Sequence, residues 1–177
     1  KDTNIVISQA REIHEFLFNR KSGNVEVKQS LSTVYACNSF RTSLYVVEMY
    51  DDQTTIDNVD FAVDGKKPKG IKPAFEYYSI DNIFFSDARV CYFELPLQKK
   101  GSTSEVKFEK TITDPRYFTS IFFTEPYNIV KKEIVVKVPR WMKVELKEMN
   151  FKGYKITKTT DYDSRDDADV FTYTITD

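Results

Sequence analysis

The sequence predicts an all-β fold, specifically a β-sandwich of about ten short antiparallel strands. The 177 residues include 14 Phe and 11 Tyr, together with many β-branched residues, and these residue types favour strands. Apolar positions mostly alternate with polar ones instead of recurring every three or four residues, and turn signals follow one another about every 8 to 15 residues. A chain of this length suits one ordinary domain, so we expect a single domain over residues 1–177.

The N-terminal region contains the one candidate for a short helix. Ser8 could cap a helix with a shared apolar face formed by Ala10, Ile13 and Leu17. The same residues also alternate between two faces, which is typical of a strand. Periodicity alone leaves helix and strand open for residues 8–18.

The first predicted hairpin follows directly. Phe16 and Phe18 precede the segment Lys-Ser-Gly-Asn at residues 21–24, and Val25 and Val27 follow it. A turn that contains glycine between two alternating apolar runs is typical of a β-hairpin.

Two further strands are expected in the first half of the chain. Residues 44–50 alternate and stop at Asp51 and Asp52, whose short carboxylates can bond their own backbone in a turn. Residues 58–63 form the next strand and end at Asp-Gly, a strong two-residue turn signal. Residues 66–73 are rich in Lys and Pro, which predicts a loop.

The second half contains the remaining strands. A turn at residues 99–102 separates strand-like segments, and Asp114-Pro115 interrupts the pattern because proline cannot donate to a strand ladder. The predicted strands are residues 83–85, 89–95, 106–113, 129–138, 142–146, 154–159 and 170–176.

The charge balance argues against two classes of partner. Lys and Arg number 26 and Asp and Glu number 27, so the net charge of -1 gives no reason to expect nucleic acid. Charged residues interrupt every apolar run well before the roughly 20 residues that a membrane span needs, so we expect no membrane span. The chain opens at Lys1 without a leader, so we expect a processed form or an excised part of a longer chain.

The residues available for catalysis are few. A thiol enzyme would need a cysteine and a histidine base, but the single histidine, His14, precedes both Cys37 and Cys91, which reverses the usual order. We interpret His14 as an exposed or half-buried strand residue, and one histidine cannot build a His-rich metal site. The cysteines are expected to be buried free thiols, with a single bridge as the alternative. We therefore expect a non-enzyme without cofactors.

Two other types of site were considered. The acidic stretch at residues 161–169 has calcium-like spacing, but Arg165 occupies a ligand position and the loop glycine is missing, so a solvated turn is preferred. Glycine spacings for phosphate binding are absent. Glycoside hydrolysis needs only two carboxylates, which 27 acidic residues could supply, but no feature of the sequence supports it.

Aromatic residues give the only candidate binding surface. Trp141, Tyr77, Tyr78 and Tyr127 could form a platform of the kind that binds sugars on β-sandwiches, or a docking surface. Most aromatics fall in strand patterns with one face that must pack, so core or domain-interface packing is the preferred interpretation.

Three segments in succession carry a resemblance to a known family. They are a strand with its acidic turn at residues 45–57, a strand at 84–95 leading to Gly101, and residues 111–139, where a turn with Pro126 leads into a strand ending Val136-Lys-Val-Pro139. Their order and spacing, from about His14 to the strand at 171–176, resemble the β domain that precedes transglutaminase-like domains in exported proteins of Bacteroidetes-type bacteria.

The resemblance implies a β-sandwich at the N-terminal part of a longer chain, beside a transglutaminase-like or cysteine-peptidase-like domain of the same polypeptide. It also implies a periplasmic or cell-surface location, which favours a bridge between Cys37 and Cys91 somewhat. It carries over no catalytic or binding residues. The expected function is a non-catalytic accessory or docking module, and the alternative is an independent module that binds a glycan or a peptide. An enzyme would instead need paired carboxylates in a cleft.

Overall fold

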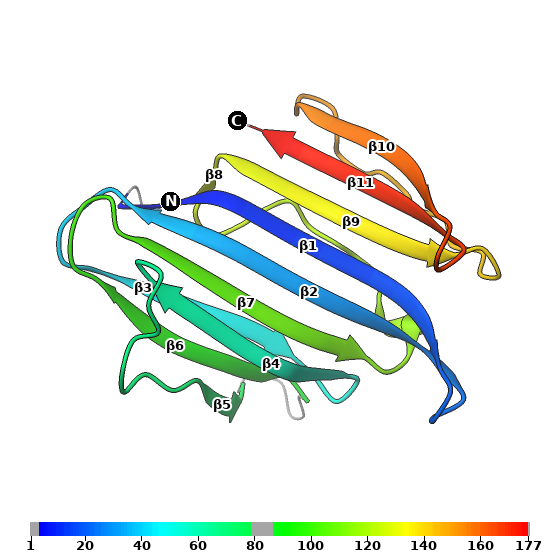
Figure 1. The fold of residues 1–177 in the computed structure, drawn as a ribbon, viewed down its shortest axis with the longest axis horizontal. Helices are drawn as coiled ribbons and strands as arrows, with labels where there is room; N and C mark the ends of the chain where they lie inside the picture. Colours follow the sequence, from blue (N-terminus) through cyan, green and yellow to red (C-terminus); the bar gives the residue numbers. More distant parts are fainter. Residues whose placement is uncertain (1–3, 79–86, 177) are drawn as a thin grey trace, which may run out of the picture.

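The computed structural model describes residues 4–78 and 87–176. These residues form eleven strands and one short 3₁₀ turn, Pro115–Tyr117. Figure 1 shows them as a long twisted sheet with a smaller sheet beside its lower half. The all-β sandwich predicted from the sequence is therefore confirmed.

The larger sheet contains eight strands in the order β10-β11-β9-β1-β2-β7-β4, with β8 paired to β1. Its strands are β1 Ile5–Asn19, β2 Asn24–Cys37, β4 Thr54–Val63, β7 Thr103–Ile112, β8 Asn128–Ile129, β9 Lys131–Pro139, β10 Ile156–Asp163 and β11 Ala168–Thr176. The smaller sheet contains three strands in the order β3-β6-β5, with bounds Thr42–Tyr50, Arg89–Leu97 and Ala74–Tyr77.

The ambiguous N-terminal region is a strand and not a helix. β1 pairs antiparallel with β2 on one side and parallel with β8 and β9 on the other. Pairing on both sides satisfies the backbone groups that a helix would have bonded internally, so tertiary context decides between the two periodicities. The predicted hairpin is confirmed, with Asn19 opposite Asn24 and Gly23 in the left-handed conformation that its turn requires.

The strands differ from the prediction in length and direction. β1 and β2 contain 15 and 14 residues, so they are long and not short. The pairing of β1 with β9 is parallel, because the chain crosses from the end of β7 through residues 113–127 before it returns beside β1. Purely antiparallel pairing was therefore a wrong expectation for the centre of the larger sheet.

Other element predictions have mixed outcomes. Residues 142–146 were predicted as a strand but have no strand partner, and the short strand β5 was not predicted. The strand predicted at residues 83–85 lies outside the described residues. The Asp64-Gly65 turn after β4 is confirmed, with both residues at positive φ (49° and 73°), as a two-residue hairpin turn of this type requires.

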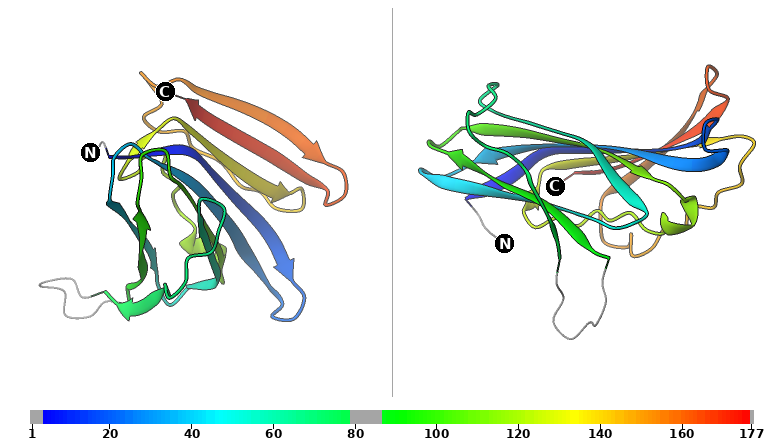
Figure 2. Two further views of the ribbon diagram at one scale, coloured as in Figure 1. Left: turned by 60° about the vertical axis from the view of Figure 1, so that its left-hand side comes forward. Right: turned by 90° about the horizontal axis from the view of Figure 1, so that it is seen from below.

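One face of the larger sheet, here called the inner face, is covered by two different layers. Figure 2 shows the smaller sheet as a separate layer whose strands cross under the larger sheet. Between the two sheets lies a first apolar cluster that includes Ile5, Phe61, Phe93, Leu95 and Phe108. The rest of the inner face carries a second apolar cluster. Irregular chain covers this second cluster, with packed side chains Phe118, Ile121, Phe123, Met142, Val144, Leu146 and Phe151.

Candidate functional site

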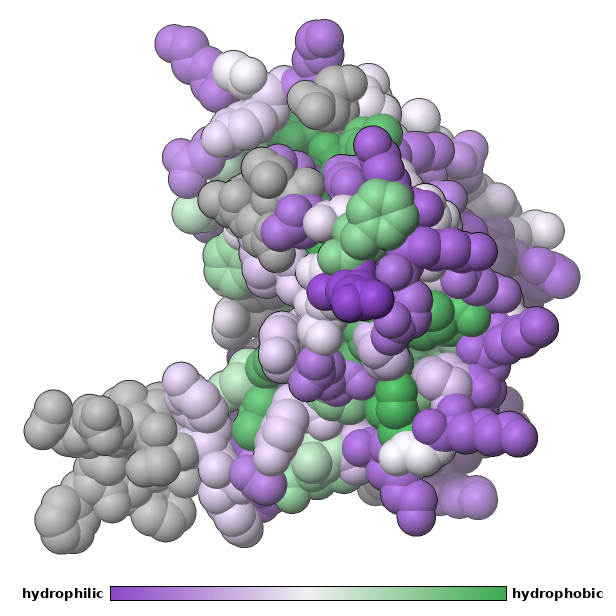
Figure 3. All heavy atoms as spheres, turned by 90° about the vertical axis from the view of Figure 1, so that its left-hand side faces the viewer, coloured by the Kyte–Doolittle hydropathy of each residue, from purple (hydrophilic) through white to green (hydrophobic). Residues whose placement is uncertain are grey.

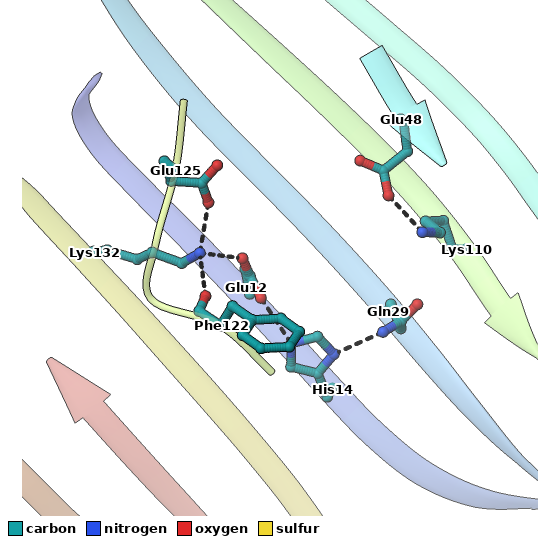
Figure 4. A network of polar contacts seen from close by, with 8 residues as sticks. All are labelled: Glu12, His14, Gln29, Glu48, Lys110, Phe122, Glu125 and Lys132. Carbon is teal, nitrogen blue, oxygen red and sulfur yellow. Dashed lines mark hydrogen bonds and ion pairs between the residues drawn. The ribbon is translucent and has the colours of Figure 1, made fainter. Parts of the chain in front are cut away.

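A band of polar side chains crosses the inner face between the two apolar clusters. Neighbouring strands and the segment before β8 contribute to it, and Figure 4 shows its members as sticks. We call this band the polar seam and define it by Glu12, His14, Gln29, Glu48, Lys110, Glu125 and Lys132. Inward positions on strands normally carry apolar residues, so a band of charge here requires complete pairing.

Lys132 anchors the seam on β9. Its side chain is 1% exposed, and its ammonium group lies 2.6 Å from a carboxylate oxygen of both Glu12 and Glu125. It also donates a hydrogen bond of 2.8 Å to the carbonyl oxygen of Phe122. Three acceptors match the three protons of an ammonium group, so this buried charge is satisfied. Lys132 thereby ties the irregular segment at residues 122–125 to the centre of the larger sheet.

His14 continues the seam across β1 and β2. Its Nδ1 lies 3.0 Å from the Gln29 side-chain nitrogen, and its Nε2 lies 3.0 Å from Glu12 Oε2. Because the amide nitrogen of Gln29 donates to Nδ1, this arrangement assigns the proton to Nε2, which donates to Glu12. His14 is 2% exposed, so its interpretation as an exposed or half-buried residue was wrong.

Opposing effects set the pKa of Glu12. Burial alone would raise this pKa, but the hydrogen bond from His14 and the charge and hydrogen bond of Lys132 outweigh burial. The pKa of Glu12 therefore lies below its ordinary value, and Glu12 is held as a carboxylate inside the sandwich.

The other end of the seam joins the two sheets. Lys110 on β7 forms an ion pair with Glu48 on β3 and donates a hydrogen bond of 3.2 Å to the carbonyl oxygen of Met49. This contact fixes β3 over the larger sheet. The whole seam contains three carboxylates and two lysines, so it has an excess of negative charge.

A cavity of about 290 Å³ opens beside the seam. Its walls come from β3, from the inner face of β1, β2 and β7, and from residues 125–127. The carboxylates of Glu12, Glu48 and Glu125 line it. Tyr35 also lines it, and the pKa of Tyr35 is raised strongly, first by burial and then by the charge of Glu125.

The two outer faces of the sandwich differ in character. The face of the smaller sheet that points away from the core carries large apolar side chains, which we call the outer apolar face and define by Tyr45, Val47, Met49 and Tyr92. Their exposed fractions are 65%, 59%, 43% and 39%. Val47 and Tyr92 are direct neighbours on β3 and β6, so these side chains form a continuous patch.

The outer face of the larger sheet carries ion pairs instead. Arg11 on β1 contacts its direct neighbour Glu133 on β9 at 2.9 Å, and Lys137 contacts Asp163 at 3.0 Å. In Figure 3, hydrophilic side chains predominate on the right-hand side of the molecule, with a few apolar ones between them. The charged face is typical of a surface in contact with water, whereas the apolar one is not.

The four aromatics predicted as a platform do not come together. Tyr77 and Tyr78 lie at the end of β5 in the smaller sheet, whereas Trp141 lies in the turn after β9 of the larger sheet, and all three are exposed. Tyr127 packs edge-on against Tyr35 with ring centroids 5.7 Å apart, as core packing predicts. Within residues 4–78 and 87–176, no ring contact joins any two of the four.

The structure also places the two cysteines and the acidic stretch that the sequence offered as candidate sites. Cys37 and Cys91 are buried free thiols in the first apolar cluster, so the bridge favoured by the family resemblance does not form. The acidic stretch at residues 161–169 comprises the end of β10, the hairpin turn and the start of β11, and Lys137 pairs there with Asp163 and Asp166. The part of the chain that the structure describes has no cluster of three His, Cys, Asp or Glu residues suited to a metal ion.

Sequence reasoning missed the polar seam, because its members lie far apart in the chain. Only the register of β1 could have revealed it, since Glu12 and His14 share a face with Phe16. No helix among the described residues is long and apolar enough to cross a membrane.

The fold is similar to parts of larger solved structures. One is a candidate protease from Parabacteroides distasonis, with 11% identity and a TM-score of 0.63 over 99% of this chain and 36% of that one. Another is an M1 zinc metallopeptidase from Deinococcus radiodurans, with 9% identity and a TM-score of 0.51 over 98% of this chain and 39% of that one. This chain therefore spans little more than a third of each.

These identities establish similarity of fold alone. No curated protein matches the sequence. A family described as a domain of unknown function with solved structure, DUF3857, matches residues 48–177. This match covers well over half of the sequence, and the chain belongs to the DUF3857 family.

Proposed function

We propose that this chain is a non-catalytic accessory domain of a longer, exported protein with a transglutaminase-like or cysteine-peptidase-like domain. It docks onto that adjacent domain through the outer apolar face of the smaller sheet. The observation that carries this proposal is the unpartnered apolar surface formed by Tyr45, Val47, Met49 and Tyr92. A periplasmic or cell-surface location belongs to the same proposal.

Energetics support a covered outer apolar face. Full burial of a large apolar side chain contributes about 1.5 to 3 kcal/mol, and these four are roughly half exposed. Covering all four would contribute several kcal/mol, which is enough to hold two domains of one chain together. The inner side of the same strands is already packed, so the outer apolar face serves no purpose in the core.

The solved structures that share this fold support a position within a larger protein. Both are proteins with peptidase descriptions, and the similar region is little more than a third of each. A domain in such a position has neighbours of its own chain to contact.

The polar seam supports a structural role for its charges. Lys132 pairs with both Glu12 and Glu125 inside the sandwich, and Lys110 engages Glu48. Each of these carboxylates is engaged by a lysine, whereas a catalytic acid or base must be free to exchange protons.

The proposal is tested by placing a charge on the outer apolar face in the natural polypeptide that carries this chain. Val47→Asp is expected to release the domain, which lowers the midpoint of thermal unfolding and increases cleavage by added protease between the domains. Val130→Asp is the matched control, because Val130 is 49% exposed and lies between β8 and β9 of the larger sheet. Equal behaviour of the two variants would refute docking through this face.

The alternative of an independent glycan-binding module lacks a supporting observation. The four aromatics predicted for it make no ring contact with one another within the described residues, and Tyr77 instead stacks under Arg89, which also lies over Tyr50. Peptide binding has a different basis in the structure, the cavity beside β3.

A further inference from the structure

β3 is an edge strand of the smaller sheet. It pairs with β6 on one side, and among residues 4–78 and 87–176 it has no strand partner on the other. The cavity of about 290 Å³ lies along this free edge. A free edge presents backbone N–H and C=O groups that can pair with another extended chain.

The backbone of β3 itself faces the cavity. Tyr45 and Val47 line it although their side chains belong to the outer apolar face. The carbonyl oxygen of Met49 accepts a hydrogen bond from Lys110, so it points away from β6. In an antiparallel pair, alternate residues point their backbone groups in the same direction, so Tyr45 and Val47 also point theirs toward the free edge.

The walls of the cavity carry negative charge. Three carboxylates line it, from Glu12, Glu48 and Glu125, and no Lys or Arg does. Lys110 and Lys132 engage these carboxylates from outside the lining, and they are two cations against three anions. The raised pKa values agree with this excess, because Glu125 acts on Tyr35, and Glu48 adds to burial in raising that of Cys91 to about 11.

The size of the cavity limits what can enter. Sites for cofactors and drug-sized ligands usually span about 300 to 1,000 Å³, so this one lies at the lower limit. Its volume suits one long side chain. The side chains of a strand added to β3 would alternate, and every second one would point inward toward Glu12 and Tyr35.

We propose that the free edge of β3 binds an extended peptide segment by strand addition, with a lysine or arginine side chain of that segment in the cavity between Glu48 and Glu125. Backbone hydrogen bonds along Tyr45 to Val47 supply affinity for any extended chain, and the carboxylates supply the preference for a basic residue. A desolvated ammonium or guanidinium group gains charge-assisted hydrogen bonds there.

The test uses acetylated, amidated pentapeptides of the form Thr-Val-X-Val-Thr, titrated into the protein and followed by NMR shifts of its backbone amides. With X as Lys or Arg, we expect shifts centred on β3 and residues 125–127, and at least tenfold tighter binding than with X as Glu. N-methylation of alternate peptide bonds should weaken binding at least tenfold, because it removes the donors for strand pairing.

Protein variants locate the charge preference. Glu125→Gln should reduce the preference for Lys over Glu, and Glu94→Gln on the outward side of β6 should leave it unchanged. The peptide series on the unaltered protein keeps the proposal testable if Glu125→Gln fails to fold. Equal affinity for the Lys and Glu peptides, insensitivity to N-methylation, or shifts confined to other strands would overturn it.

Discussion

The two sheets of this domain bury their surfaces in different ways. The larger sheet has one face covered by the smaller sheet and by irregular chain, and its other face carries ion pairs such as Arg11 with Glu133. The smaller sheet also has one covered face, but its other face carries Tyr45, Val47 and Tyr92. The comparison teaches that the larger sheet is completed within the chain, whereas the outer apolar face of the smaller sheet is uncovered among the described residues, which is why we propose it as the docking surface.

The largest expected effect comes from breaking the inner cover of the larger sheet. Lys132→Ala leaves the carboxylates of Glu12 and Glu125 without their shared cation, so it should lower the free energy of unfolding by about 3 to 5 kcal/mol. The control is Lys131→Ala at the exposed neighbouring position, which should change it by less than about 0.5 kcal/mol. Urea denaturation checks both values. Similar losses in the free energy of unfolding for the two variants would contradict a stabilising role of the polar seam.

The next effect separates the two faces of the smaller sheet. Leu95→Ala on β6 removes a fully buried side chain from the first apolar cluster and should cost about 2 to 5 kcal/mol. Tyr45→Thr, on the outer apolar face and next to Leu44, the β3 partner of Leu95, should change stability by about 0.5 kcal/mol or less. Chemical denaturation measures both. A large loss for Tyr45→Thr would mean that the outer apolar face already supports the core.

A smaller effect on the polar seam is expected from lowering the pH, through protonation of Glu12. The folded-state pKa of Glu12 lies below its ordinary value of 4.5, so its contribution to stability is complete above that value and disappears as pH falls through the folded pKa. We therefore expect the midpoint temperature of thermal unfolding of the parent protein to decrease when the pH is lowered below about 4.5.

Glu12→Gln isolates this contribution. The variant should unfold at a lower temperature at pH 7, and the difference from the parent should narrow as the pH falls below 4.5, because Glu12 of the parent then takes up a proton. A constant difference across this range would show that the carboxylate is not held ionised by His14 and Lys132.

The smallest effect belongs to the outer face of the larger sheet. Arg11→Ala breaks an exposed ion pair with Glu133 and should cost no more than about 1 kcal/mol, and 1 M salt should abolish the cost. Thermal unfolding at low and high salt measures it. A larger, salt-independent loss would mean that this face contributes more than solvated charge.

The sequence predicted the fold class well because local signals govern strands and turns. Alternation and the turns at Gly23 and Asp64-Gly65 located β2, β3 and β4, whereas the alternation of β1 left helix and strand open for residues 8–18. The same rule failed at residues 142–146, where Met142, Val144 and Leu146 alternate because they pack on the second cluster without any strand partner. Alternation therefore reports burial on one side, and backbone pairing needs a neighbour that the local sequence does not contain.

The site was less predictable. In the sequence, Lys132 is one of two adjacent lysines, and nothing nearby indicates that it is buried. Its role depends on its ion pairs with Glu125 and with Glu12, which is distant in the sequence. None of the residues of the outer apolar face was among the four aromatics predicted for a ligand or docking surface. Of those four aromatics, Tyr127 packs against the first apolar cluster, whereas Trp141, Tyr77 and Tyr78 are exposed at other places on the two sheets.

The most direct test of docking is hydroxyl-radical footprinting of the natural polypeptide, read out by mass spectrometry of oxidised side chains. Tyr45, Met49 and Tyr92 report on the outer apolar face, and Tyr117 and Tyr162 are exposed references elsewhere on the same domain. If the face is docked, its three residues will be oxidised at least fivefold more slowly than the references. Oxidation in proportion to their exposure in this structure would contradict docking through the smaller sheet.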